Sequence, residues 1–239
     1  VYTTFILRIT FMRDLLVKIA LRLGIYQQIV EYINRIKFAI QSRRMRKNGL
    51  HMLDAATQVF DAMHIPAFLT YGALLGAYRD KGFISYDPDI DLGVLANQIP
   101  SDLHEQMAKA GFQLHRQSVL ANGQVFEETY IYKKLHLDIF YYFQEGNDYY
   151  SIIARKHETK DWKEANATDG FPCDRSYVPI CEFEKREFLG LQVYMPKDTD
   201  GWLRAIYSDS YMTPIKNWNA KDYKTRIVHS EERSYRKFF

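Results

Sequence analysis

Segments with the period of a strand and segments with the period of a helix follow one another irregularly through residues 49–239. This irregular order favours an α+β fold built on a mixed β-sheet, which we expect to be small and flanked by helices. The segments that predict strands are apolar or alternate between apolar and polar residues, and they cover Ala67–Tyr71, Asp89–Val94, Val125–Lys133, Leu135–Phe143, Asn147–Ala154, Phe183–Phe188 and Gln192–Met195.

Between these strands the sequence predicts short helices. Helices are expected over 51–63, over 72–79 after a turn, from Pro100 to a stop at Gly111, and over 198–207. Leu189-Gly190 predicts the turn of a hairpin between the last two strands. Residues 155–178 resemble a loop, and the polar tail after Asn219 is expected to be loosely held.

The first 50 residues differ in charge from the rest of the chain. They contain ten basic and two acidic residues, and their apolar residues recur every three or four positions, which is typical of amphipathic helices. We therefore predict a basic helical segment over 1–48 and a catalytic domain over 49–239. The segment either packs on the domain or contacts an anionic membrane surface. The expected location is cytoplasmic, with a peripheral position on the inner membrane face as the further expectation.

Composition excludes several classes of protein. The 239 residues are 47% hydrophobic and 26% charged, which excludes a disordered, collagen-like or fully membrane-embedded chain. Two cysteines, Cys173 and Cys181, cannot build a disulfide scaffold, and a single pair argues against a zinc site. Nucleic acid is not expected as a partner, because the basic residues have no interleaved aromatic residues in a recognisable module.

The residues that carry chemistry begin directly after the first predicted strand. Gly72 and Gly76 allow a ligand to approach the backbone closely, and the start of the following helix offers free N–H groups to a phosphate. Arg79 and Lys81 add positive charge for the same anion. We therefore expect these four residues to bind the phosphates of a donor.

Acidic residues follow on two predicted strands. Asp89 and Asp91 are two residues apart, so both point to one face and can hold Mg²⁺ or Mn²⁺. Asp138 lies in an apolar strand, where a lone acid is costly unless it is paired or bound to metal. If the two strands are neighbours, three carboxylates converge, as phosphoryl or nucleotidyl transfer requires. His136 shares the face of Asp138, either supporting the site or serving as a hydrogen-bonded structural histidine.

The acidic motif has two other possible interpretations. An EF-hand with its first ligand at Asp87 fails, because Leu92 replaces the required glycine and Gln98 replaces the required glutamate. A glycosyltransferase that binds a nucleotide diphosphate through Asp89-Ile-Asp91 is a stronger competitor. It does not explain why two glycines precede the acids so closely.

The spacing of these residues resembles that of the LicD family, which includes bacterial phosphocholine transferases and fukutin-type phosphoribitol transferases. The matching pattern is Gly72-x-x-Leu75-Gly76-x-x-Arg79-x-x-Gly82-x-Ile84-x-x-Asp87-x-Asp89-x-Asp91. A second stretch, from Val193 to Pro214, is similar to the closing segment of that family, so the resemblance covers roughly residues 50–218.

The resemblance implies a nucleotidyltransferase-type fold and assigns roles to the matching positions. Asp89 and Asp91 would bind the metal with support from Asp87, and Asp138 would be the general base or a shared ligand. Gly72, Gly76 and Arg79 would lie along the donor phosphates. Ala73 departs from the hydroxyl residue that is frequent in the family, so backbone N–H groups or Ser85 would have to replace it.

The resemblance further implies a metal-dependent phosphotransferase. It would move phosphocholine, ribitol phosphate or glycerol phosphate from a CDP-linked donor to a sugar hydroxyl of a cell-surface glycan or its precursor, releasing CMP. Two alternatives stay open. One is a nucleotidyltransferase that transfers NMP from NTP and releases pyrophosphate, and the other is a catalytically inactive binding module.

Overall fold

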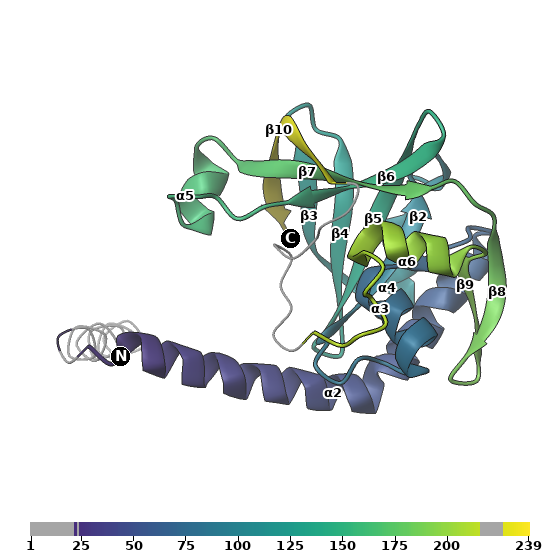
Figure 1. Cartoon of the computed structure of the whole chain (residues 1–239), viewed down its shortest axis with the longest axis horizontal. Helices are drawn as coiled ribbons and strands as arrows, with labels where there is room; N and C mark the ends of the chain where they lie inside the picture. The colour runs from purple at the N-terminus through teal and green to yellow at the C-terminus, as the bar shows by residue number, and fades with distance from the viewer. Residues whose placement is uncertain (1–21, 23, 216–226) are drawn as a thin grey trace. The chain divides into compact units, whose positions relative to one another are not determined.

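The computed structural model describes residue 22, residues 24–215 and residues 227–239 (Figure 1). The chain divides into two compact units, Val1–Arg43 and Arg44–Phe239. The domain boundary expected after residue 48 stays a prediction. Within the described residues, no helix combines the length and the apolar character needed to cross a membrane.

The first described element is one long helix, α2 (Tyr26–Ala62). The helical segment predicted over 1–48 and the helix predicted over 51–63 are continuous in this element. Gly49 lies inside it, where a Cβ would come within 2.8 Å of the Met45 methyl carbon. Glycine is tolerated here because its missing side chain leaves room for Met45. Met52 and Phe60 on the later turns are buried in the core of the larger unit. The first 23 residues of the helical segment predicted over 1–48 lie outside the described residues, apart from position 22.

Ten strands form one mixed sheet, larger than the small sheet expected. Their bounds are β1 (Phe68–Leu69), β2 (Asp89–Leu95), β3 (Gln113–Leu120), β4 (Val125–Tyr132), β5 (Leu135–Glu145), β6 (Asp148–Ala154), β7 (Phe171–Pro179), β8 (Phe183–Phe188), β9 (Leu191–Pro196) and β10 (Ile227–Phe238). The predicted β8–β9 hairpin is confirmed, and β5 pairs with β6 in the antiparallel sense.

The sheet has the strand order β4-β3-β10-β7-β6-β5-β2-β1-β9-β8. An additional pairing of β4 with β5 joins six of these strands, β3, β4, β5, β6, β7 and β10, into a closed circuit. Figure 1 shows β10 beside β3 and β7. Two pairs are parallel, β2 with β5 and β1 with β9, and the other pairs are antiparallel.

Three segments of the chain differ from the expectations from sequence. Residues 155–178 are not a loop, because they contain helix α5 (Trp162–Ala167) and most of β7. The described end of the tail is not loosely held, because it forms β10 between β3 and β7. Strand β3 was not predicted. Each of the strands β3, β7 and β10 pairs with at least one strand that is distant in the sequence, since β10 lies between β3 and β7.

The remaining helices are α3 (Tyr71–Leu75), continued by a π-helical turn η1 (Gly76–Asp80), the short 3₁₀ turn η2 (Ala96–Gln98), α4 (Leu103–Lys109) and α6 (Thr199–Tyr207). Among them, α3 contacts β2 and α6, α4 contacts β3, and α6 also contacts β7 and β9. Asp198 caps α6, since its carboxylate accepts a hydrogen bond from the Gly201 N–H at 3.0 Å.

An aromatic cluster around Trp202 anchors α6 to the sheet. The Trp202 ring is fully buried, and its centroid lies 5.5 Å from those of Phe68 and Tyr142. Phe183 closes the cluster by stacking on Phe68 with 4.0 Å between the ring centroids. This packing fixes β1, which leads directly into the candidate site.

Candidate active site

The two acidic strands are neighbours, as the interpretation of the motif required. Strand β2 runs parallel to β5, with Asp91 directly beside Asp138 and Asp89 directly beside His136. Side chains of such partners point to the same face of a sheet. The structure therefore brings Asp89, Asp91 and Asp138 to one face, next to the start of α3.

Gly72 fits against two of the acids. Its N–H donates to Asp91 Oδ2 over 3.3 Å, and a Cβ at this position would come within 2.0 Å of Asp87 Oδ2. A Cβ at Gly76 would come within 2.6 Å of the Gly82 carbonyl oxygen. Because protein atoms fill the space beside both glycines, the packing of the chain itself requires them. Their contact with a donor stays a prediction.

The two basic residues of the motif lie in different surroundings. The Arg79 side chain is only 7% exposed, bonds Asp80 at 2.7 Å and donates to the Tyr211 carbonyl over 3.3 Å. It thus joins the helix to the segment after α6. Lys81 has a left-handed backbone (φ 53°), and its Nζ lies 5.4 Å from the centre of the Tyr78 ring. The expected binding of donor phosphates by both residues remains a prediction.

The carboxyl groups of the site hold their protons strongly. Burial raises the pKa of Asp89 to about 8, with further contributions from the charge of Asp87 and a hydrogen bond with it. Burial, followed by the charges of Glu127 and Asp89, raises the pKa of Asp138 to about 8. The pKa of Asp91 also lies well above its usual value, because of burial and then of the neighbouring aspartates.

Such a cluster fits a hard divalent cation by its chemistry. Carboxylate oxygens are the ligands that Mg²⁺ and Mn²⁺ prefer, and mutually repelling acids are stabilised by a cation between them. Within the described part of the chain, however, no three His, Cys, Asp or Glu side chains are already arranged as a metal site. The site thus offers three carboxylates on one face of the sheet, from Asp89, Asp91 and Asp138. To bind one ion together, these side chains would have to turn toward it.

Asp138 is held by a network that the sequence did not reveal. Thr129 on β4 donates its hydroxyl hydrogen to Asp138 Oδ1 at 2.5 Å. Arg116 on β3 donates to Thr129 Oγ1 at 2.8 Å and to Glu127 Oε1 at 2.7 Å. Thr129 and Glu127 alternate along a predicted strand, so their shared face was the one available signal. Arg116 lies on a strand that was not predicted.

His136 occupies the edge of the same face. Its ring is stacked with that of His115, with 6.2 Å between the centroids, and burial followed by the charge of His115 lowers its pKa. The histidine therefore borders the site beside Asp89 without a described bond to a carboxylate.

A mixed sheet with aspartates on neighbouring parallel strands defines a carboxylate-centred site in an α+β domain. Residues 64–198 match the family model described as LicD/FKTN/FKRP, nucleotidyltransferase domain, and the chain belongs to this family. The match contains the motif glycines and all four aspartates of the site.

Curated relatives support the assignment. The ribitol-5-phosphate transferase FKTN of Mus musculus is 25% identical over 176 residues, which cover 74% of this chain and 36% of the relative. The human protein of the same name is 23% identical over 182 residues, covering 76% of the chain and 37% of the relative. An uncharacterized protein of Rickettsia prowazekii is 29% identical over 149 residues, covering 61% of the chain and 48% of the relative. The chain thus spans little more than a third of the length of the two transferases.

Proposed function

We propose that the chain is a phosphotransferase. It moves a phosphorylated small group, such as ribitol phosphate, phosphocholine or glycerol phosphate, from a CDP-linked donor to a sugar hydroxyl of a cell-surface glycan or its precursor, and releases CMP. The observation that carries the proposal is the pairing of Asp91 with Asp138 across parallel strands, with Asp89 on the same face. The names of the FKTN relatives make ribitol phosphate the first group to test.

Asp138 is the proposed general base. The attacking hydroxyl oxygen forms a bond to the phosphorus of the transferred group while its proton passes to the Asp138 carboxylate, and CMP leaves with the electrons of the broken P–O bond. In the metal-free protein the pKa of Asp138 is about 8, and a bound divalent cation would lower it, so that the carboxylate is ionised and can accept the proton at neutral pH. The hydrogen bond from Thr129 fixes the orientation of that carboxylate.

Asp89 and Asp91 are the proposed ligands of Mg²⁺ or Mn²⁺, with Asp138 as a shared ligand and Asp87 in support. A bound divalent cation would supply neutralising charge for the donor phosphates. Asp87 contacts Gly72 and is hydrogen-bonded to Asp89, so it holds the neighbouring acid rather than lying apart from the cluster.

The direct test is transfer with each CDP-linked donor and the parent, Asp89→Asn, Asp91→Asn and Asp138→Asn variants. We expect CMP release that depends on Mg²⁺ in the parent and falls at least about a hundredfold in each variant, as for the loss of a general base. Asp102→Asn, at an exposed carboxylate before α4, is the matched control and should keep full activity. Unchanged turnover in any of the three site variants would refute its assigned role.

The products separate this proposal from its competitors. Release of pyrophosphate from an NTP would favour the nucleotidyltransferase alternative. If the protein forms no product from any donor and binds an acceptor glycan without metal or nucleotide, an inactive binding module would be favoured.

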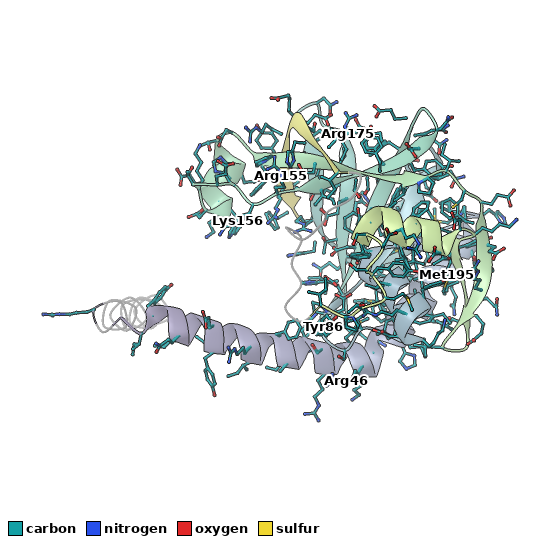
Figure 2. All side chains as sticks on the ribbon, viewed as in Figure 1. Arg46, Tyr86, Arg155, Lys156, Arg175 and Met195 are labelled. Carbon is teal, nitrogen blue, oxygen red and sulfur yellow. The ribbon has the colours of Figure 1, made fainter. Side chains whose placement is uncertain are left out.

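The described part of the N-terminal unit supports a proposal about location. An apolar stripe along α2 is 40–47% exposed and contains Ile29, Ile33, Ile36 and Ile40. Arg35 and Arg43 on the same helix are exposed and form no ion pair with another described residue. Arg46, at the start of the larger unit, projects outward from the helix (Figure 2). Isoleucines flanked by cations suit an anionic membrane surface, at the cytoplasmic face where lipid-linked acceptors would be reached.

Vesicle binding tests this location. The full-length chain should bind vesicles that contain phosphatidylserine more tightly than vesicles of phosphatidylcholine alone. Ile33→Glu should weaken binding, while Gln28→Glu, which adds the same charge at another exposed position of α2, should weaken it less. Equal binding by parent and Ile33→Glu would reject the membrane surface.

A further inference from the structure

A row of side chains on three neighbouring strands, β5, β4 and β3, leads away from the carboxylates. Asp138 on β5 pairs with Thr129 on β4, and Thr129 pairs with Arg116 on β3. Because paired residues point to the same face, the arginine shares the face of the aspartate. The Thr129 hydroxyl bridges them through its two hydrogen bonds.

A second row runs parallel to the first, one step further along the strands. Glu127 on β4 pairs with Ser118 on β3, and Ser118 pairs with Arg236 on β10. Ser118 donates to Glu127 Oε2 at 2.8 Å, which confirms that these side chains meet on this face. The C-terminal strand therefore brings a second arginine to the face that carries the acids.

The two guanidinium groups have more hydrogen-bond donors than they have anionic partners among the described residues. Glu127 accepts from Arg116 at 2.7 Å, whereas Arg236 forms no ion pair with a described residue and lies 4.7 Å above the ring of Phe171. The Nε atoms of both guanidiniums are buried and have no hydrogen-bond acceptor. Buried donors without acceptors are costly, so an oxyanion that reached both arginines would be stabilised.

The position of the pair fits a substrate that also reaches the carboxylates. Neighbouring strands lie about 4.8 Å apart, so the backbones at Arg116 and Arg236 lie two and three strands, or about 10 and 14 Å, from that of Asp138. Arginine side chains shorten this gap. Arg236 also lies outside residues 64–198, the part of the chain that matches the family model.

We propose that Arg116 and Arg236 form a phosphate-binding subsite beside the aspartate cluster. The inference deepens the proposed transferase function and rests on it for the identity of the substrate. The phosphate belongs either to the donor or to the acceptor, and both sources present the same tetrahedral oxyanion. Arg116 has two roles, because it also positions Thr129. Arg236 has the single role of binding the anion.

Inorganic phosphate is the probe, titrated by calorimetry near neutral pH with the full-length protein. Arg236→Gln should raise the dissociation constant at least about tenfold, as for the loss of one charge-assisted hydrogen bond, and Arg236→Lys should raise it less. The matched control is Lys237→Gln, which removes an exposed cation from the opposite face of β10. Circular dichroism and the thermal midpoint establish that each variant is folded.

Absence of phosphate binding by the parent, or equal constants for the parent, Arg236→Gln and Arg236→Lys, would overturn the subsite. If Arg236→Gln does not fold, the comparison of Arg236→Lys with Lys237→Gln decides. Steady-state transfer then identifies the source, since Arg236→Lys should raise KM for the donor or for the acceptor, with a smaller change in kcat. Phosphate binding that depends on Arg236 in a protein without transferase activity would keep the subsite and remove the proposed function.

Discussion

Asp138→Asn should make the metal-free protein more stable at neutral pH, although it removes the proposed general base. Burial, with the charges of Glu127 and Asp89, raises the pKa of Asp138 to about 8, whereas an aspartate in an unfolded chain titrates near 3.9. Between these values the folded protein holds a proton that the unfolded chain has lost. Folding is therefore coupled to proton uptake at this position.

The sign and size of the effect follow from this proton. Because the folded state binds more protons, the free energy of unfolding is highest near and below pH 4 as far as this group is concerned, and falls as the pH rises toward 8. One retained proton gives a slope of about 1.4 kcal/mol per pH unit, or about 3 kcal/mol between pH 5 and pH 7. Asparagine does not titrate and its carbonyl oxygen can still accept from Thr129, so the variant should lose this part of the slope.

Urea denaturation at about pH 5 and about pH 7, with a chelator present, measures the change. The parent should lose stability between the two conditions, and Asp138→Asn should lose less, by about 1–3 kcal/mol once the coupling among the aspartates is allowed for. Asp102→Asn, at an exposed carboxylate, should follow the parent to within about 0.5 kcal/mol. A parent that gains stability toward pH 7, or a variant with the parent's slope, would refute the reasoning.

Three further substitutions test the packing around the site. Gly72→Ala places a Cβ within 2.0 Å of Asp87 Oδ2 and should lower the free energy of unfolding by about 1–3 kcal/mol in urea denaturation; a neutral result would mean that Asp87 moves freely. Trp202→Ala empties the centre of the aromatic cluster and should cost about 3–5 kcal/mol, seen as a large drop in Tm; a small drop would mean that the cluster collapses around the gap. Tyr71→Phe removes the hydroxyl that lies 2.5 Å from Ser151 Oγ and should cost about 1 kcal/mol by the same denaturation assay, unless the serine finds another partner.

Local patterns in the sequence were sufficient for the acidic half of the site. Alternation along Asp89–Val94 and the apolar surroundings of Asp138 each predict a strand, and both strands are present as β2 and β5. The motif also predicted the face that Asp89 and Asp91 share. The pattern could not predict that the two strands are neighbours. Strand pairing depends on the arrangement of the whole sheet and not on the alternation of residues within one strand.

The cationic half could not be predicted in this way. Strand β10 alternates weakly, since most of its side chains are at least partly exposed on both faces and Ser234 is the one that is fully buried. Its order comes from backbone pairing with β3 and β7, which lie roughly 50 to 120 residues earlier in the chain. No spacing rule connects Arg236 with Arg116, so only the register of the sheet brings them together.

The structure gives a different reason for the two glycines of the motif than the one inferred from the sequence. Glycine after a strand suggested room for a ligand, yet Asp87 fills the space beside Gly72 and the Gly82 carbonyl fills that beside Gly76. Close approach is indeed the reason for both glycines, but the approaching atoms belong to the chain. The glycines of the motif are therefore needed for packing against other atoms of the chain, whether or not they also contact a donor.

The pairing of β4 with β5 decides whether acids and arginines can act on one substrate. In the linear order of the sheet, β3 and β5 are separated by β10, β7 and β6, which would put Arg116 about 19 Å from Asp138 across the strands. Closure through β4 reduces this to two strand spacings, or about 10 Å, and adds the hydroxyl of Thr129 between the two side chains. A substrate that carries both a reacting phosphorus and a second anionic group can span that distance. Strand β4, which contributes no residue to the glycine–aspartate motif, is therefore the element on which the combined site depends.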